Sequence, residues 1–182
     1  EYTAGIGDYA FSGCTSLTGM GFSENVASIG DYAFSGCTAL SSLTLPESLK
    51  EMGYYMIAST AISSITIPKN VSYSDSSSYN GALANCKSLT EVTFEDGMTR
   101  IPGYICASGS YTSYITKVVI PESVTEIGYA AFYSCNNLVI SSVPKAVKTI
   151  EGSAFYECGK IMSMNLPNTI TSVGDRAFQN CT

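Results

Sequence analysis

Apolar and polar residues alternate along the chain in a pattern that repeats about every 23 residues. The segment IGDYAFSGCT occupies residues 6–15 and returns unchanged at residues 29–38. One unit reads L-x-x-L-x-L-P-x-x-V-x-x-I-G-x-x-A-F-x-x-C-x-x, and about eight units fit the chain, counting partial ones at both ends. The Phe position of this unit is held in turn by Phe11, Phe34, Ile57, Leu83, Cys106, Phe132, Phe155 and Phe178. The Val position is held by Thr3, Val26, Leu49, Val71, Met98, Val124, Val147 and Ile170.

Each unit predicts two short strands and one turn. The L-x-x-L-x-L part, such as residues 40–45, alternates at its end as a strand with one buried face does. The strand should end at Pro46, which has no N–H for a ladder. The V-x-x-I part, such as residues 26–29, predicts a second, shorter strand, and the glycine after it allows a bend. The A-F-x-x-C part, such as residues 33–37, is too short for a long helix and predicts one helical or 3₁₀ turn.

A unit of 23 residues cannot bury its own apolar side, so the units must stack on one another. We therefore expect a repeat solenoid of about eight coils, with equivalent strands paired in a parallel β-sheet about 4.8 Å apart. Residues 1–182 form one right-handed solenoid domain in this interpretation. The sequence begins at Glu1 without a secretion signal and ends within a unit at Thr182, so we expect it to come from a longer polypeptide.

Composition excludes several classes of protein. Apolar residues make up 45% of the chain, which is too many for a disordered protein. No apolar stretch is long enough to span a membrane, and a net charge of −6 argues against a surface for nucleic acids or anionic lipids. The chain has no histidine, hence no imidazole base or metal ligand, and it contains no nucleophile or phosphate-binding motif. We therefore expect no enzymatic activity, no catalytic residues, no metal site and no cofactor.

The seven cysteines follow the repeat. All except Cys106, which holds the Phe position, occupy one position of the unit: Cys14, Cys37, Cys86, Cys135, Cys158 and Cys181. Stacking would place neighbouring members about 5 Å apart at Cα, but with parallel side chains that keep their Cβ atoms too far apart for a typical disulfide. We interpret these residues as reduced thiols in the core, with disulfide bridges as the alternative.

Two insertions interrupt the repeat between residues 71 and 115. They read YSDSSSYNGAL and ASGSYTSY, and their tyrosines are Tyr73, Tyr79, Tyr111 and Tyr114. Because both insertions fall at the same phase of adjacent units, they should emerge side by side. Tyrosine and serine are favoured in binding loops, so we regard these four residues as candidate binding residues, with a tolerated insertion as the alternative.

Two further surfaces are candidates. Outward positions of the first strand are mostly small and polar, as on a solvated face, but they become apolar at Val119, Val139, Ile140 and Met162. This group predicts either a contact surface or a local change of register. Tyrosines also recur two residues before the Phe position, at Tyr9, Tyr32, Tyr55 and Tyr104, and just after it at Tyr133 and Tyr156. Such a column covers the edge of the core or, alternatively, binds sugars or peptide.

The I-G-x-x-A-F-x-x-C and L-x-x-L-x-L-P motifs resemble the BspA-like class of leucine-rich repeat, over nearly the whole chain. Departures from the pattern lie mainly at residues 52–115. The resemblance implies a leucine-rich-repeat-like solenoid from a bacterial cell-surface or secreted protein, and it carries over no catalytic residue. It also implies a non-catalytic adhesion or protein-interaction module whose partner is a host matrix protein or a cell-surface protein. A structural spacer that presents other domains, or a glycan-binding module that uses the tyrosines, are the alternatives.

Overall fold

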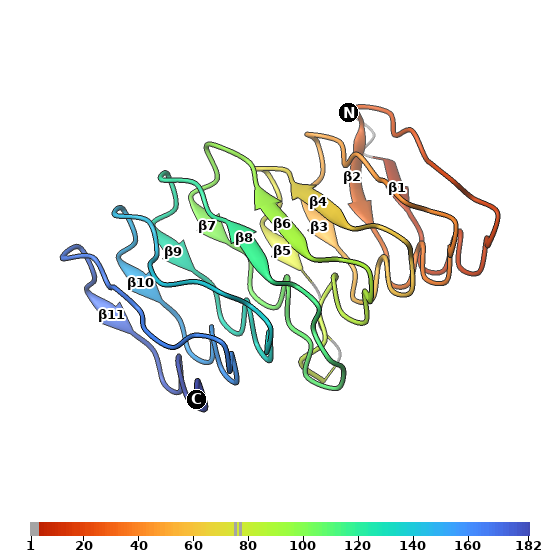
Figure 1. Cartoon of the computed structure of the whole chain (residues 1–182). Coiled ribbons are helices and arrows are strands. Elements are labelled where there is room, and N and C mark those ends of the chain that lie inside the picture. The colour runs from red at the N-terminus through yellow and green to blue at the C-terminus, as the bar shows by residue number, and fades with distance from the viewer. Residues whose placement is uncertain (1–3, 75, 77) are drawn as a thin grey trace.

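The computed structural model describes residues 4–74, 76 and 78–182. The chain winds as an elongated stack of coils, with the N-terminal coils at one end and the C-terminal coils at the other (Figure 1). The eight members of the Phe position are separated by seven intervals, which gives the solenoid about seven turns. The predicted repeat solenoid is thereby confirmed. Thr3 of the Val position, and Asp75 and Ser77 of the first insertion, lie outside the described residues.

Parallel strands line two sides of the solenoid. On one side lie two four-stranded sheets, in the orders β1-β2-β3-β5 and β7-β9-β10-β11. Their strands are β1 (Ala4–Ile6), β2 (Val26–Ile29), β3 (Glu51–Met52), β5 (Tyr73–Ser74), β7 (Arg100–Ile101), β9 (Glu126–Ile127), β10 (Thr149–Ile150) and β11 (Ser172–Val173). The other side carries one three-stranded sheet, made of β4 (Ser64–Ile67), β6 (Glu91–Phe94) and β8 (Lys117–Val119).

Of the two strands predicted for each unit, the one expected to be shorter forms in more units than the other. The V-x-x-I part, expected to be the minor strand, forms a strand in every unit, whereas the L-x-x-L-x-L part does so only in three central units. Neighbouring coils approach closely along the V-x-x-I part, since a Cβ on Gly53 would lie 2.4 Å from the backbone N of Asp31. Gly53 does not have a positive φ, so this glycine serves close packing of coils rather than a bend. Along the L-x-x-L-x-L part, a cavity of about 620 Å³ separates residues 42–47 from β4 and β6, and residues 40–45 form no strand.

The A-F-x-x-C part is not helical, which corrects the predicted helical or 3₁₀ turn; the described residues contain no helix, and thus none that could cross a membrane. Instead, residues with left-handed backbone lie on both sides of the Phe position, as at Tyr32 (φ 53°) and Gly36 (φ 75°). A left-handed residue ends helical winding and turns the chain. The N–H groups then donate to the next coil: Phe34 N lies 2.8 Å from Met56 O, and Gly36 N lies 2.8 Å from Ala58 O.

The core is a continuous column of stacked side chains. The rings of Phe132 and Phe155 lie 5.1 Å apart, and those of Phe155 and Phe178 lie 5.2 Å apart with only 5° between their planes. Phe11 and Phe34 stack in the same way at 5.2 Å. Each coil thus covers the apolar face of its neighbour, as the repeat predicts.

The cysteine position forms a second column in the core. All seven cysteines are free thiols, and the Sγ atoms of Cys37 and Cys158 donate to the carbonyl oxygens of Phe11 and Phe132 at 3.0 and 3.2 Å. Burial raises the pKa of Cys135 to about 12, although a hydrogen bond with Ser113 lowers it in part. These contacts support the interpretation of the cysteines as core thiols. Cys14, in the first coil, is exposed.

We predict that Phe132→Ala lowers the free energy of unfolding by about 3–5 kcal/mol, because it opens a cavity beside the stacked ring of Phe155 and the edge-on ring of Phe94. Met162→Ala is the matched control, since Met162 is 96% exposed, and it should change stability by less than about 0.5 kcal/mol. Denaturant unfolding of the two variants measures both values. Equal effects would contradict the stacked core.

We also predict that a thiol reagent applied to the native protein at mildly alkaline pH modifies Cys14 quickly. The buried thiols, Cys37, Cys86, Cys106, Cys135 and Cys158, should react only after unfolding, because burial keeps them protonated and shielded. In denaturant without reductant, most of the seven thiols should titrate as free. Recovery of three disulfide bridges would contradict this prediction.

Candidate functional site

The two insertions lie against each other, as their common phase predicts. Asn80 forms an antiparallel bridge with Ser108, and Gly109 N donates to Tyr79 O at 3.0 Å. The amide of Asn80, which is only 1% exposed, joins the insertions further: its Oδ1 accepts from Ser110 N at 3.0 Å, and its Nδ2 donates to Ser110 Oγ at 3.1 Å. The insertions therefore form one structured feature rather than two separate loops.

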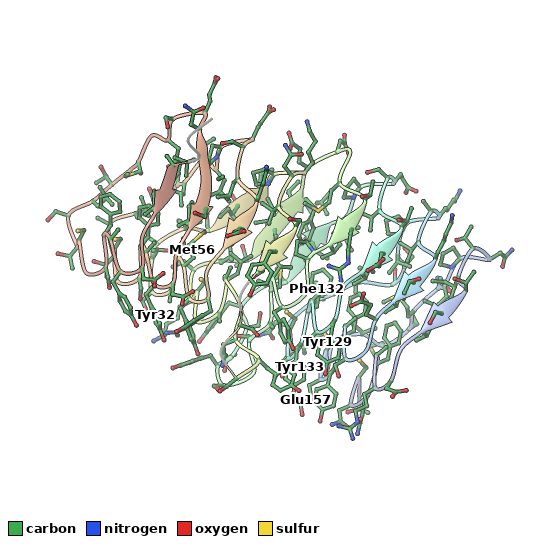
Figure 2. The ribbon with its side chains drawn as sticks, turned by 180° about the vertical axis from the view of Figure 1, so that it is seen from behind. Tyr32, Met56, Tyr129, Phe132, Tyr133 and Glu157 are labelled. Carbon is green, nitrogen blue, oxygen red and sulfur yellow. The ribbon has the colours of Figure 1, made fainter. Side chains whose placement is uncertain are left out.

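Tyrosine rings in mutual contact run along the turn side of the solenoid, where Figure 2 labels Tyr32, Tyr129 and Tyr133. In the N-terminal section, Tyr32 stacks on Tyr9 at 4.9 Å and on Tyr55 at 5.0 Å. In the C-terminal section, Tyr133 stacks on Tyr156 at 4.7 Å. We call the whole group the tyrosine strip; it comprises Tyr9, Tyr32, Tyr54, Tyr55, Tyr79, Tyr104, Tyr111, Tyr129, Tyr133 and Tyr156.

Each insertion contributes one ring to a different section of the strip. Tyr111, from the second insertion, meets Tyr55 of the N-terminal section edge-on at 5.8 Å. Tyr79, from the first insertion, stacks on Tyr133 at 4.7 Å and contacts Tyr104 at 5.9 Å. The first insertion thus contacts the C-terminal section of the strip, and the second insertion contacts the N-terminal section.

Some rings of the strip cover the edge of the core, and others are exposed to solvent. Tyr55 is only 8% exposed and packs in a small cluster with Ala58 and Ala84, so it covers the edge of the core as predicted. Burial, followed by the nearby Tyr111, raises the pKa of Tyr55. Tyr9, in contrast, is 57% exposed, and Tyr79, Tyr111 and Tyr129 are also exposed. Exposed Tyr111 therefore contacts a buried ring, whereas exposed Tyr9 and Tyr79 contact half-buried rings of the strip.

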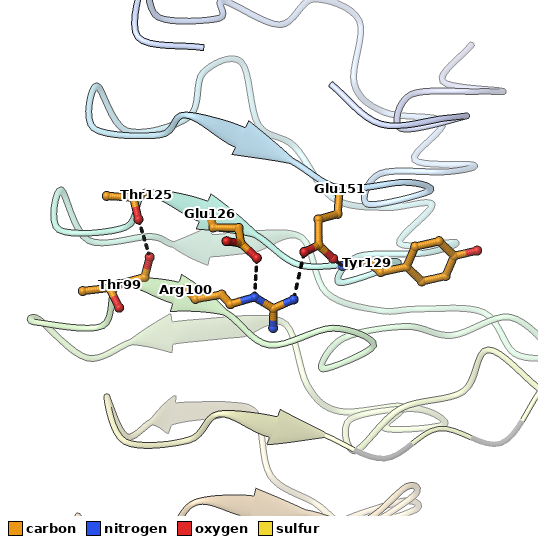
Figure 3. A network of polar contacts seen from close by, with 6 residues as sticks. All are labelled: Thr99, Arg100, Thr125, Glu126, Tyr129 and Glu151. Atoms are coloured by element: carbon orange, nitrogen blue, oxygen red, sulfur yellow. Dashed lines mark hydrogen bonds and ion pairs between the residues drawn. The ribbon is translucent and has the colours of Figure 1, made fainter. Parts of the chain in front are cut away.

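An ion-pair network beside β7, β9 and β10 fixes the backbone at Tyr129 (Figure 3). Arg100 pairs with Glu126 and, at 3.0 Å, with Glu151. The Glu151 carboxylate also accepts from Tyr129 N at 2.6 Å. Burial raises the pKa of Glu151, but hydrogen bonds with Glu126 and Arg100 outweigh it and leave the pKa below its usual value. A charged Glu151 thus anchors the turn that carries a strip residue.

The other predicted binding residues lie outside the strip. Tyr73 is on β5, paired in register with Glu51 of β3, and Tyr114 is exposed just before β8. Val119, Val139 and Met162 are exposed on the side of β8. Ile140 is half-buried and packs against the core, as a local change of register predicts. Of the four insertion tyrosines, Tyr79 and Tyr111 contact other rings of the strip.

One feature that the sequence interpretation missed is a cavity of about 520 Å³ at the C-terminal end of the strip. It is lined by Tyr79, Tyr129, Tyr133, Ser153, Tyr156, Asp175 and Arg176. The available signal was the loss of tyrosine from its column, where Ala130 and Ser153 follow Tyr104. Among the described residues, no group of three or more acidic or cysteine side chains is placed to hold a metal ion.

Solved structures with the same fold come from bacteria. A leucine-rich repeat protein from Bacteroides ovatus is 26% identical with a TM-score of 0.65; the match covers 97% of this chain and 50% of that one, so this chain spans half the length of that relative. The T. pallidum leucine-rich repeat protein is 26% identical with a TM-score of 0.57, over 97% of this chain and 69% of that one. The pneumococcal vaccine antigen PcpA shares the fold at 19% identity and a TM-score of 0.50, over 97% and 52% of the two chains.

Comparison with curated proteins gives no match. The profile of the BspA type leucine-rich repeat region, in contrast, matches residues 4–113 and 108–182 in six copies. This match covers nearly all of the described coils, including the two insertions. The chain belongs to the BspA-type leucine-rich repeat family.

Proposed function

We propose that the chain is a protein-interaction module of a bacterial cell-surface or secreted protein, and that the tyrosine strip is its binding surface. The observation that carries this proposal is that each insertion places one ring, Tyr79 or Tyr111, against a different section of the strip. A tolerated insertion has no need to pack a tyrosine ring against either section. The partner in this proposal is a host matrix protein or a bacterial or host cell-surface protein.

The physical character of the strip supports this proposal. Tyrosine offers a large contact area and one hydroxyl while losing little conformational entropy on binding. Because the exposed rings already stack on their neighbours, their ordering is complete before a partner arrives. Family membership agrees with surface exposure and protein binding, although a fold by itself assigns no partner.

Features of the strip also weigh against the two alternatives. Sugar binding uses the open face of an aromatic ring, but stacking at 4.7 Å covers most ring faces between Tyr79, Tyr133 and Tyr156. A spacer would need only the regular repeat, whereas this chain adds two joined insertions with four tyrosines.

A paired substitution tests the proposal. After a screen of matrix proteins, bacterial surface proteins and glycans identifies a protein partner, Tyr79→Ser with Tyr111→Ser should weaken its binding about tenfold or more. The matched control is Tyr73→Ser with Tyr114→Ser, which removes two exposed tyrosines of the same insertions that lie outside the strip. Calorimetry or surface plasmon resonance should show a change of less than about twofold for this control pair.

Three results would count against the proposal. Equal losses in the two variant pairs would remove the strip as the binding surface. A screen that yields only glycans would favour carbohydrate binding, and a screen that yields nothing would favour a spacer.

A further inference from the structure

One position of the repeat has a left-handed backbone in seven of its eight members, although their side chains differ. This position lies two residues before the Phe position, and we call it the ladder position. Seven of its eight members, Tyr9, Tyr32, Tyr55, Tyr104, Ala130, Ser153 and Arg176, have φ angles of 57°, 53°, 54°, 59°, 51°, 55° and 59°. The eighth member, Gly81 of the first insertion, does not have a positive φ. Four of the seven are tyrosines, and the first three stack as successive rings at 4.9 and 5.0 Å. A change of side chain here adds or removes a ring without changing the fold.

At Ser153 the ladder lacks a ring, and the cavity of about 520 Å³ opens there. Ser153 itself is 6% exposed and forms part of the lining. Ala130 also lacks a ring, but it is fully buried, and the Tyr79 ring contacts both Tyr104 and Tyr133 in that region. The first insertion therefore compensates for the missing ring at Ala130, whereas nothing in the described part of the chain does so at Ser153.

The walls of this cavity combine tyrosine rings with polar and charged groups, which suits an aromatic side chain that carries an N–H or O–H group. Tyr133 and Tyr156 stack at 4.7 Å along one wall, and Tyr129 leans over the next coil, where a Cβ on Gly152 would lie 3.1 Å from its Cε2. Arg176, the next member of the ladder position, supplies a guanidinium group, which stacks on aromatic faces. Ser153 and Asp175 supply oxygen atoms that can accept a hydrogen bond from an indole N–H or a phenol O–H.

We propose that this cavity receives a tryptophan or tyrosine side chain of the partner polypeptide, which takes the place of the missing ring at Ser153. The inserted ring packs among the tyrosines of the lining and lies against the guanidinium of Arg176. The proposal rests on the proposed function in one respect, namely that the partner is a protein. It adds a defined pocket and the kind of residue that fills it.

The composition of the chain permits a direct test. The chain has no tryptophan, so the fluorescence of the peptide Gly-Trp-Gly, excited where tyrosine does not absorb, reports only on the peptide. Addition of the protein should shift its emission to shorter wavelength and raise its anisotropy, with a dissociation constant on the order of 0.1–1 mM for so small a ligand. Gly-Ala-Gly should compete poorly, and Gly-Tyr-Gly should compete well.

Variants at the ladder position locate the binding. Ser153→Tyr restores the ring of the repeat on a backbone that already carries tyrosine elsewhere, and it should abolish peptide binding while the protein remains folded. Arg176→Ala removes the guanidinium and should weaken binding about two- to fivefold. Ser41→Tyr, which adds a tyrosine at an exposed position outside the strip, is the matched control and should leave binding unchanged.

Several outcomes would overturn the inference: no peptide binding, binding that survives Ser153→Tyr, or tighter binding of a methyl pyranoside than of Gly-Trp-Gly. If Ser153→Tyr fails to fold, full binding by Arg176→Ala overturns it as well.

The tests of the pocket and of the strip can fail separately. A pocket that binds no peptide, beside a partner that still depends on Tyr79 and Tyr111, removes only this inference. A pocket that binds peptide, beside a partner indifferent to those tyrosines, removes the strip instead.

Discussion

Backbone hydrogen bonds between neighbouring coils hold each turn directly over its equivalent, and the other regular features of the molecule depend on this alignment. Phe34 N and Gly36 N reach the carbonyls of Met56 and Ala58 only because left-handed residues point them out of the turn. Each such residue costs about 1–2 kcal/mol when it is not glycine. In return, side chains at one repeat position lie about 5 Å apart along the stack, which produces the phenylalanine column, the thiol contacts and the tyrosine strip.

Much of this arrangement could be predicted from the sequence, because a strict period fixes which residues share an environment. The stacked Phe132 and Phe155, the buried cysteine column and the contact between the insertions all follow from phase. The dominant strand could not be predicted, since it depends on how closely coils approach at Gly53 and its equivalents. The sequence also could not predict which section of the strip each insertion contacts, because the positions of Tyr79 and Tyr111 depend on contacts outside the repeat.

The candidate site draws its rigidity from the scaffold on which it lies. Tyr55 is buried, Tyr32 stacks on it, and Tyr9 stacks on Tyr32 while remaining exposed. Aromatic contacts of this kind contribute about 0.5–1.5 kcal/mol each beyond the burial of area. Stability and the proposed recognition therefore share the same side chains, and the ion pairs of Arg100 and Glu151 extend this support to Tyr129.

The ladder position has a consequence for how such proteins diversify. Since its backbone accepts Tyr104, Ala130, Ser153 or Arg176 with nearly the same φ, a single substitution in one of these units adds or removes a ring on an unchanged backbone. Duplication of a unit adds another copy of the ladder position without requiring a new fold. Selection for a different partner can thus proceed one coil at a time, and closely related chains can differ in specificity although their cores are interchangeable.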